Sequence, residues 1–185
     1  KPVTDTPEKI RELLKRAKTE SAVHILPIGA VTLGQEGGII TDMKGMAEAG
    51  AVGVSEDGKS VMNSQVYREG MKLARENGLV VMAHCEDKNL VNGGVMNAGA
   101  KAEELGLPGI TNAVEDVIVA RDILLAKETG AKLHLCHCST ADSVALTRLG
   151  RELGVDVTAE VCPHHFVMSC EEITEDHGRF KMNPP

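Results

Sequence analysis

The stretch Gly130-Ala131-Lys132-Leu133-His134-Leu135-Cys136-His137 contains the pattern that decides the fold. A glycine supplies the left-handed backbone that ends a helix, and the short apolar run after it is typical of a strand buried on both faces. A histidine then closes the run. The same unit, a glycine followed by an apolar run, also begins at Gly50, Gly78 and Gly154. This repetition predicts helices that alternate with strands.

The predicted strands are short and each is preceded by a helix, which implies a parallel sheet with right-handed crossovers. Four of them cover residues 51–55, 79–83, 131–136 and 155–161, and another is expected at 23–28. The stretch 88–109 is rich in Gly and Asn and is too long for a plain connection, so we expect a loop on the substrate side. No linker divides the chain, and residues 1–185 are expected to form a single domain.

The helices carry their own start signals. Thr6 before Pro7 is typical of an N-cap and the first helical residue. Asn112 with Glu115 resembles a capping arrangement at the start of another helix. Two more helices are expected at 64–77 and 142–153.

The composition argues against nucleic-acid binding. Of 185 residues only three are aromatic, Tyr67, Phe166 and Phe180, so the rings that stack on single-stranded bases are scarce. The formal net charge of −7 leaves no basic stripe to neutralise phosphates. We therefore expect no nucleic-acid partner.

Two further features concern the location of the protein and the ends of the chain. No apolar run approaches the roughly 20 residues of a membrane span, and the five cysteines lack the spacing of a disulfide framework, so we expect reduced thiols in the cytoplasm. The chain begins without Met and stops at Asn183-Pro184-Pro185, as expected of a piece of a longer protein.

Polar side chains follow four of the predicted strands directly. Asp57, His84 and His137 each come just after an apolar run, and His164 and His165 follow the last one. The carboxyl ends of parallel strands meet at one edge, where α/β folds place their active sites. Imidazole combined with carboxylate is typical of zinc or a similar divalent ion in a catalytic site with an open position.

Simpler interpretations exist for each of these residues. Asp57 before Gly58 suits a turn, and a lone histidine such as His84 is commonly a core or surface residue. His164 and His165 are expected to be structural, since only one of two neighbours can face a pocket. A Cys-ligated structural zinc at Cys136-His137-Cys138 is disfavoured, because neighbouring strand residues point to opposite faces.

Five motifs in this order carry a family resemblance. They are Ser55-Glu56-Asp57-Gly58, Ala83-His84-Cys85-Glu86, His134-Leu135-Cys136-His137-Cys138-Ser139-Thr140, Thr158-Ala159-Glu160-Val161-Cys162-Pro163-His164-His165 and Lys181-Met182-Asn183-Pro184-Pro185. The chain resembles the bacterial type I dihydroorotases of the amidohydrolase superfamily. The resemblance implies a (β/α) barrel of TIM type, of which the chain would hold about strands three to seven of eight.

The resemblance also implies roles for individual residues. His84 and His137 match two histidines that bind zinc, and Asp57 matches a carboxylate that bridges two metal positions, with one or two zinc ions per complete site. Asn183 matches an asparagine that contacts the substrate. The implied reaction interconverts N-carbamoyl-L-aspartate and L-dihydroorotate in pyrimidine biosynthesis. The catalytic Asp of strand eight would lie outside this chain, so the chain alone is expected to be inactive.

Several alternatives and partners stay open at this point. An allantoinase or dihydropyrimidinase would carry a carbamylated lysine near the position of Asp57, for which Lys59 is the neighbouring candidate. A non-catalytic homologue could act as a structural partner. A homo-oligomer and an association with aspartate transcarbamoylase are further expectations.

Overall fold

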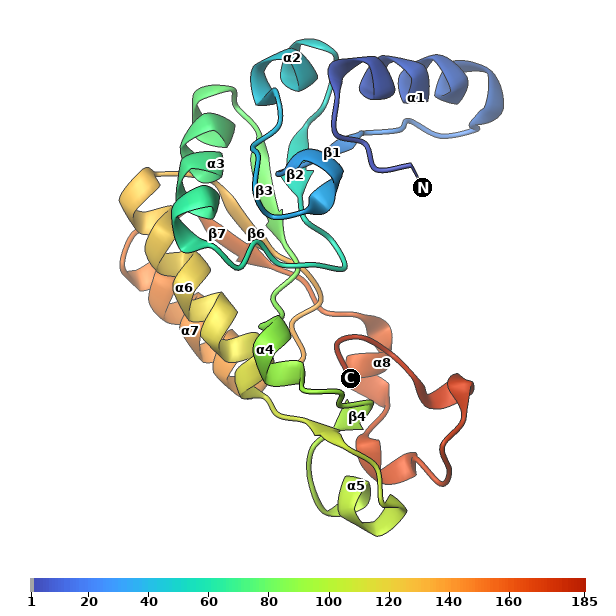
Figure 1. Ribbon diagram of the computed structural model, residues 1–185. Helices are drawn as coiled ribbons and strands as arrows, with labels where there is room; N and C mark the ends of the chain where they lie inside the picture. The colour runs from blue at the N-terminus through green and yellow to red at the C-terminus, as the bar shows by residue number, and fades with distance from the viewer. Residues whose placement is uncertain (1) are drawn as a thin grey trace.

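A computed structural model describes residues 2–185 (Figure 1). Five parallel strands form one sheet, and their order across the sheet is also their order along the chain. The strands are β1 (Ile28–Ala30), β2 (Gly53–Ser55), β3 (Val80–Ala83), β6 (Leu133–Leu135) and β7 (Val157–Ala159). The predicted parallel sheet is confirmed.

Five helices lie side by side in the same order as the strands. They are α1 (Pro7–Glu20), α2 (Met43–Glu48), α3 (Ser64–Glu76), α6 (Ala113–Thr129) and α7 (Ala141–Glu152). Each packs against the next, from α1 to α7, as one layer (Figure 1). A doubly wound sheet would carry helices on both faces, whereas a barrel carries them on the outside. The fold is therefore a partial (β/α) barrel, as predicted. None of the helices formed by residues 2–185 is long and apolar enough to span a membrane.

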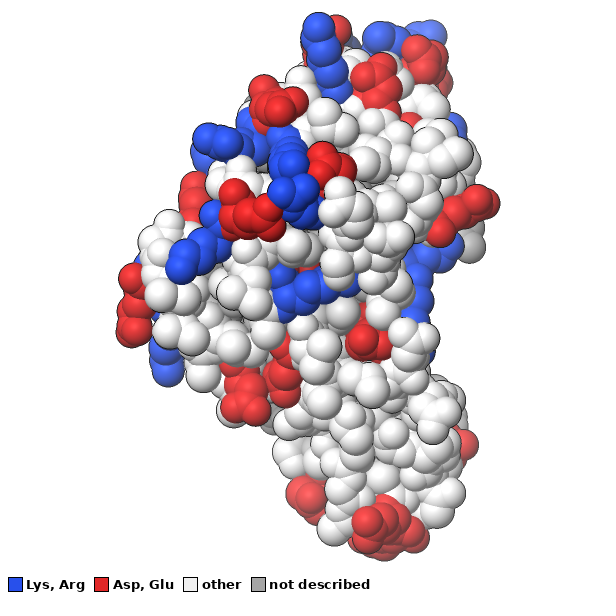
Figure 2. All heavy atoms as spheres, turned by 60° about the vertical axis from the view of Figure 1, so that its left-hand side comes forward, with Lys and Arg blue, Asp and Glu red and all other residues white. Residues whose placement is uncertain are grey.

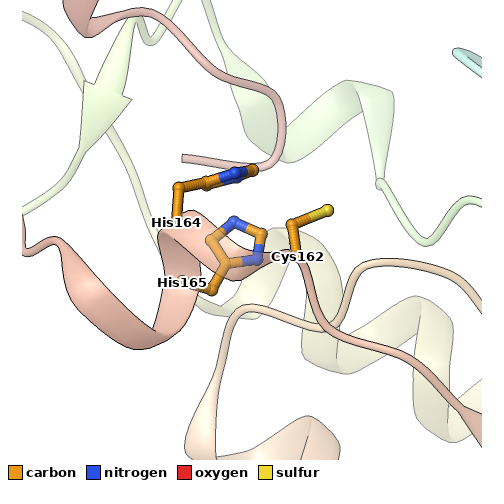
Figure 3. Close-up of side chains that lie close together, drawn as sticks. All are labelled: Cys162, His164 and His165. Atoms are coloured by element: carbon orange, nitrogen blue, oxygen red, sulfur yellow. The ribbon is translucent and has the colours of Figure 1, made fainter.

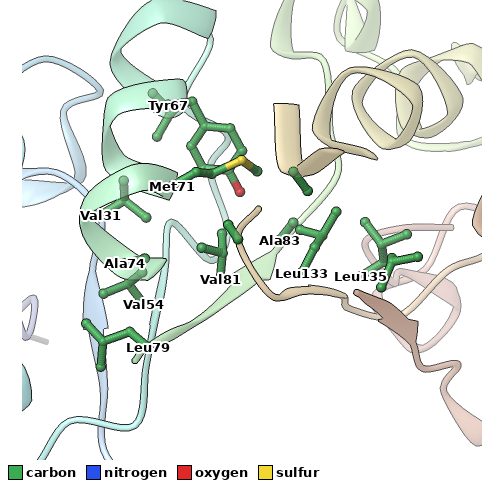
Figure 4. Packing of buried hydrophobic residues seen from close by; sticks show 14 of the residues in the cluster. Val31, Val54, Tyr67, Met71, Ala74, Leu79, Val81, Ala83, Leu133 and Leu135 are labelled. Carbon is green, nitrogen blue, oxygen red and sulfur yellow. The ribbon is translucent and has the colours of Figure 1, made fainter. Parts of the chain in front are cut away.

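The two faces of the sheet differ in burial. Register places one residue of each of four adjacent strands in a single row, and all four are buried beneath the helices: Val54, Val81, Leu133 and Val157. Figure 4 shows Val54 and Val81 below Met71 and Tyr67 of α3, and Leu133 beside Ala83 in the same cluster. We call this side the covered face. The next row points the other way and is only partly shielded or exposed: Ser55, Met82, His134 and Thr158. We call this side the bare face.

The N-terminal segment departs from expectation at its strand. The helix start is confirmed, because the Thr6 hydroxyl accepts the Lys9 N–H at 3.4 Å and Pro7 is the first helical residue. The strand expected at 23–28 instead begins at Ile28. Pro27 has no N–H for a ladder, and its carbonyl accepts from Val52 just before the paired residues of β2.

The predicted capping by Asn112 and Glu115 is wrong. Asn112 already has helical angles, with φ −56° and ψ −31°, and its side chain caps nothing. Glu115 is buried and accepts hydrogen bonds from Ser139 instead. The helix itself is present, since α6 begins one residue later.

A lobe extends below the carboxyl ends of the strands (Figure 1). Its first part, within the expected loop 88–109, contains α4 (Lys88–Val91), β4 (Met96–Asn97), α5 (Ala100–Leu105) and β5 (Gly109–Ile110). Its second part contains α8 (Pro163–Val167) and the 3-10 turns η2 (Cys170–Glu172) and η3 (Gly178–Phe180); a third turn, η1 (Leu33–Gln35), follows β1. Lys181 joins the two parts by donating to the Val95 carbonyl at 3.4 Å. On the face shown in Figure 2, charges of both signs cover the barrel, whereas the lobe shows few charges apart from acidic residues at its tip.

Candidate metal centre

Asp57, His84 and His137 come together just beyond the ends of three adjacent strands. Asp57 follows β2 in a turn that Gly58 closes with a φ of +71°, and its N–H donates to Ser55 Oγ at 3.0 Å. His84 directly follows β3, and His137 stands two residues beyond β6. Each residue offers one ligand atom, and these three atoms lie within 4.8 Å of one another.

The two imidazoles make the closest contact of the group. His84 Nδ1 lies 3.0 Å from His137 Nε2, and the rings meet edge to face with centroids 4.8 Å apart. Asp57 Oδ1 lies 4.0 Å from His84 Nδ1. His84 is buried, whereas the Asp57 side chain is 75% exposed. One side of the cluster is thus closed by protein and the other is open, as a site that admits a small molecule requires.

Glu86 orients His84 from behind. Its Oε2 lies 2.8 Å from His84 Nε2, so the imidazole donates its Nε2 proton to the carboxylate. This leaves the Nδ1 lone pair directed toward His137 and Asp57. A carboxylate that holds the far nitrogen of a histidine is the usual support for a metal ligand. The donor set therefore fits a divalent metal ion.

His137 is adapted to the same role by its backbone and its burial. Its φ of +38° lies in the left-handed region, which is uncommon for a residue other than glycine and turns the side chain toward His84. Burial, followed by the neighbouring His84, lowers the pKa of His137. A neutral imidazole keeps the lone pair that a metal requires.

Asn183 reaches this cluster from the end of the chain. Its amide nitrogen donates to Glu86 Oε2 at 3.1 Å. Asn183 also lines a small cavity together with His84, Asn97 and Asn112. The segment 88–109 thus supplies part of the wall on the side of the sheet where the strands end.

Two buried glutamates, whose roles sequence reasoning missed, hold the loops that carry the cluster. Glu56 accepts the backbone N–H groups of Val31 and Thr32, each at 3.1 Å. Glu115 accepts the Ser139 N–H at 3.0 Å and the Ser139 hydroxyl at 2.6 Å. In the sequence, the only sign of the role of Glu56 is its position next to Asp57. The position of Glu115 three residues after Asn112 instead suggests a helix cap.

The other candidate residues lie apart from this centre. Lys59 donates to the Gln35 carbonyl at 3.0 Å. His134 faces the bare side, where it contacts Thr158 and Glu160. His164 and His165 lie on the helix α8 and line a second cavity in the lobe. Neither of them lines the cavity beside His84 and Asn183, so their structural role stays a prediction.

Comparison with protein families gives one clear match. A family model described as "Dihydro-orotase-like" matches residues 1–143. A dihydroorotase of Pelotomaculum thermopropionicum is 47% identical over 184 residues, and one of Lactobacillus acidophilus is 41% identical over 184 residues. Each comparison covers 100% of this chain but only 43% of the relative. The chain therefore spans less than half the length of the curated relatives it matches.

Solved structures support the architecture. An L-hydantoinase from Arthrobacter aurescens superposes with a TM-score of 0.72 and 21% identity over 92% of this chain and 39% of that one. A D-hydantoinase gives a TM-score of 0.67 and 18% identity over 89% of this chain and 37% of that one. At these identities the likeness concerns the fold alone.

Proposed function

The chain belongs to the dihydro-orotase-like family, and from this membership we propose that it is the central, metal-binding part of a dihydroorotase. The protein would interconvert N-carbamoyl-L-aspartate and L-dihydroorotate. The observation that carries the proposal is the convergence of Asp57, His84 and His137 from three adjacent strands. Relatives named dihydroorotase, at 41% and 47% identity, support the choice of substrate.

Asp57, His84 and His137 would hold the ion, which we propose to be zinc, with one or two ions per complete site. When bound, such an ion supplies a Lewis acid that polarises the ring amide carbonyl and lowers the pKa of water. Glu86 would keep His84 in the tautomer whose Nδ1 can bind. Lys59 is engaged with the Gln35 carbonyl, which favours Asp57 over a carbamylated lysine as the carboxylate of this site.

The remaining steps need groups that bind and move protons. In hydrolysis, water adds to the ring carbonyl carbon, the C–N bond breaks, and the water proton passes to the leaving nitrogen. We assign this transfer to the strand-eight Asp implied by the family resemblance, which is not among these residues. Asn183 would hydrogen-bond the polar edge of the ring, because its amide lies beside Glu86 at the same cavity.

We propose that the protein works in the cytoplasm. All five cysteines, Cys85, Cys136, Cys138, Cys162 and Cys170, are free, and reducing conditions keep them so. Assembly as a homo-oligomer and association with aspartate transcarbamoylase stay predictions of the family resemblance.

The experiment compares two carboxylate-to-amide variants in the full-length protein. Asp57→Asn should lose the metal bound at this site and at least about 100-fold of dihydroorotate hydrolysis, since even losing a hydrogen bond to a ligand costs about 10–100-fold. Asp142→Asn, exposed on α7, should change neither. Metal content and release of N-carbamoyl-aspartate are the measurements.

Three results would contradict the proposal. Hydrolysis of allantoin or hydantoin without dihydroorotate would indicate a related cyclic amidohydrolase. A protein that binds metal but hydrolyses none of these would indicate a non-catalytic homologue. Hydrolysis by the 185-residue chain alone, with zinc added, would show that the strand-eight carboxylate is not needed.

A further inference from the structure

A second cluster of metal-capable side chains lies in the lobe, at the first turn of α8. Cys162, His164 and His165 each offer one ligand atom, and the three atoms lie within 4.8 Å of one another. Figure 3 shows the two rings and the thiol gathered beside the start of the helix. The rings meet edge to face with centroids 4.2 Å apart.

One ring nitrogen of each histidine in this cluster is unsatisfied. His164 Nε2 and His165 Nδ1 are buried and have no hydrogen-bond partner among the described residues. Buried polar atoms are normally paired, and each exception calls for an explanation. In the cluster of Asp57, His84 and His137, by contrast, both His84 nitrogens have partners.

The tautomer of His165 is set by its surroundings. Its Nε2 lies 3.4 Å from the Pro184 carbonyl oxygen, which can only accept, so Nε2 carries the proton. The buried Nδ1 therefore presents a lone pair and needs a proton donor or a metal. A histidine whose far nitrogen donates to a backbone carbonyl is a common form of metal ligand.

We propose that Cys162, His164 and His165 form a second metal site, which binds zinc or a similar borderline-soft divalent ion. One thiolate and two imidazoles are ligands that such ions prefer. An open cavity of about 300 Å³ adjoins the histidines and leaves room for a water as the fourth ligand. Binding releases the Cys162 proton to solvent.

The ion would act as a structural link. Cys162 lies three residues beyond β7, and His165 contacts Pro184, the neighbour of Asn183. The metal would therefore fix the position of His165, whose hydrogen bond to Pro184 joins the end of the sheet to the segment that carries Asn183. The inference rests on these contacts and does not depend on the proposed activity.

A third cluster of metal-capable side chains lies on the bare face, but its histidine has a partner for each ring nitrogen. His134, Cys136 and Glu160 also lie within 4.8 Å of one another. Both nitrogens of His134 are engaged, Nδ1 with Thr158 at 2.8 Å and Nε2 with Glu160 at 3.4 Å. This cluster serves as an internal comparison for the experiment.

Co²⁺ titration of the metal-free full-length protein separates the sites, because only a thiolate ligand gives sulfur-to-cobalt charge-transfer absorption. The band should appear in the unmodified protein and be lost in Cys162→Ser. The band should persist in Cys170→Ser and in Cys136→Ser. Cys170 lines the same cavity but lies outside the cluster, and Cys136 belongs to the cluster on the bare face. His164→Asn and His165→Asn should each weaken Co²⁺ binding at this band by at least about tenfold. Absence of the band, its survival in Cys162→Ser or its loss in Cys136→Ser would overturn the proposal.

A second measurement needs no variant and covers the case in which Cys162→Ser does not fold. In the unmodified protein, Zn²⁺ should slow alkylation of Cys162 while that of Cys170 continues, as read by mass spectrometry of peptides. Equal alkylation of Cys162 with and without Zn²⁺ would overturn the proposal. Dihydroorotate hydrolysis measured on the same preparation distinguishes this outcome from a failure of the proposed function.

Discussion

The covered face and the bare face of the sheet are built from alternate residues of the same strands, yet their surroundings differ. The row of Val54, Val81, Leu133 and Val157 is sealed under helices, whereas the row that contains Met82 and Thr158 lacks such a layer. The candidate metal ligands belong to neither row, because they stand beyond the strand ends. We therefore expect stability to depend chiefly on the covered face, whereas the candidate metal ligands lie on the loops beyond it.

The largest effect should come from the covered face. Leu133 is 1% exposed on β6, between β3 and β7. Leu133→Ala in the 185-residue chain should therefore cost about 2–5 kcal/mol of unfolding free energy, since it leaves a cavity. Urea denaturation measures this. A cost below about 1 kcal/mol would show that the covered face is not the stabilising one.

A buried carboxyl group behind the covered face, that of Asp122, should make stability depend on pH. Burial raises the pKa of Asp122 to about 6 from an ordinary 3.8, although Arg121 opposes the shift from 2.8 Å. Between these values the folded protein keeps a proton that the unfolded chain has released. Stability from this group is therefore full below about pH 4 and falls by about 3 kcal/mol as the pH rises to about 6.

The control is Asp122→Asn, which has no carboxyl group to titrate. Its unfolding free energy, measured from pH 4 to pH 7, should lack the decrease that Asp122 causes. An identical decrease in both proteins would assign the effect to other groups.

A smaller effect should come from the loop above the covered face. Glu115→Gln keeps the size of the side chain but weakens the bonds to the Ser139 N–H and hydroxyl. We expect a loss of about 1–3 kcal/mol, as for a buried charged hydrogen bond. Metal affinity at His137, two residues before Ser139, should also fall. Thermal unfolding and metal titration measure the two effects, and unchanged metal affinity would separate this loop from the site.

The smallest effect should come from the bare face. Met82→Ala removes a large side chain from the strand beside Leu133, but Met82 is only partly buried. In the 185-residue chain we expect a cost below about 1 kcal/mol in urea, because little apolar area returns to water. A cost equal to that of Leu133→Ala would abolish the distinction between the faces.

Much of the sheet could be predicted because its signals are local. The glycines at helix ends and the apolar runs after them indicate β2, β3, β6 and β7. The first strand begins later than its sequence pattern predicts. The apolar residues before Pro27 are typical of a strand, but Val23 and Leu26 are each 70% exposed. The small elements of the lobe are too short for a pattern to identify.

The supports of the site could not be predicted, for a different reason. Glu56 bonds to Thr32, Glu115 to Ser139 and Ser60 to His84, and each pair is separated by 24 residues. A separation of 24 residues along the sequence is about the length of one strand and one helix. The partners therefore meet only when neighbouring strand–helix pairs pack together. No local pattern reports such a contact.

The matching order of strands along the chain and across the sheet has a consequence for how the protein is made. A ribosome releases the N-terminal part first, so each new strand can add to the free edge of a sheet that already exists. The step from β3 to β6 spans residues 84–132, yet doubling the length of a loop costs only about 0.6 kcal/mol in closure entropy. Assembly in the order of synthesis can therefore tolerate an extra lobe between β3 and β6. Each of the strands from β2 to β7 in this sheet can pair with a strand that has already been synthesised.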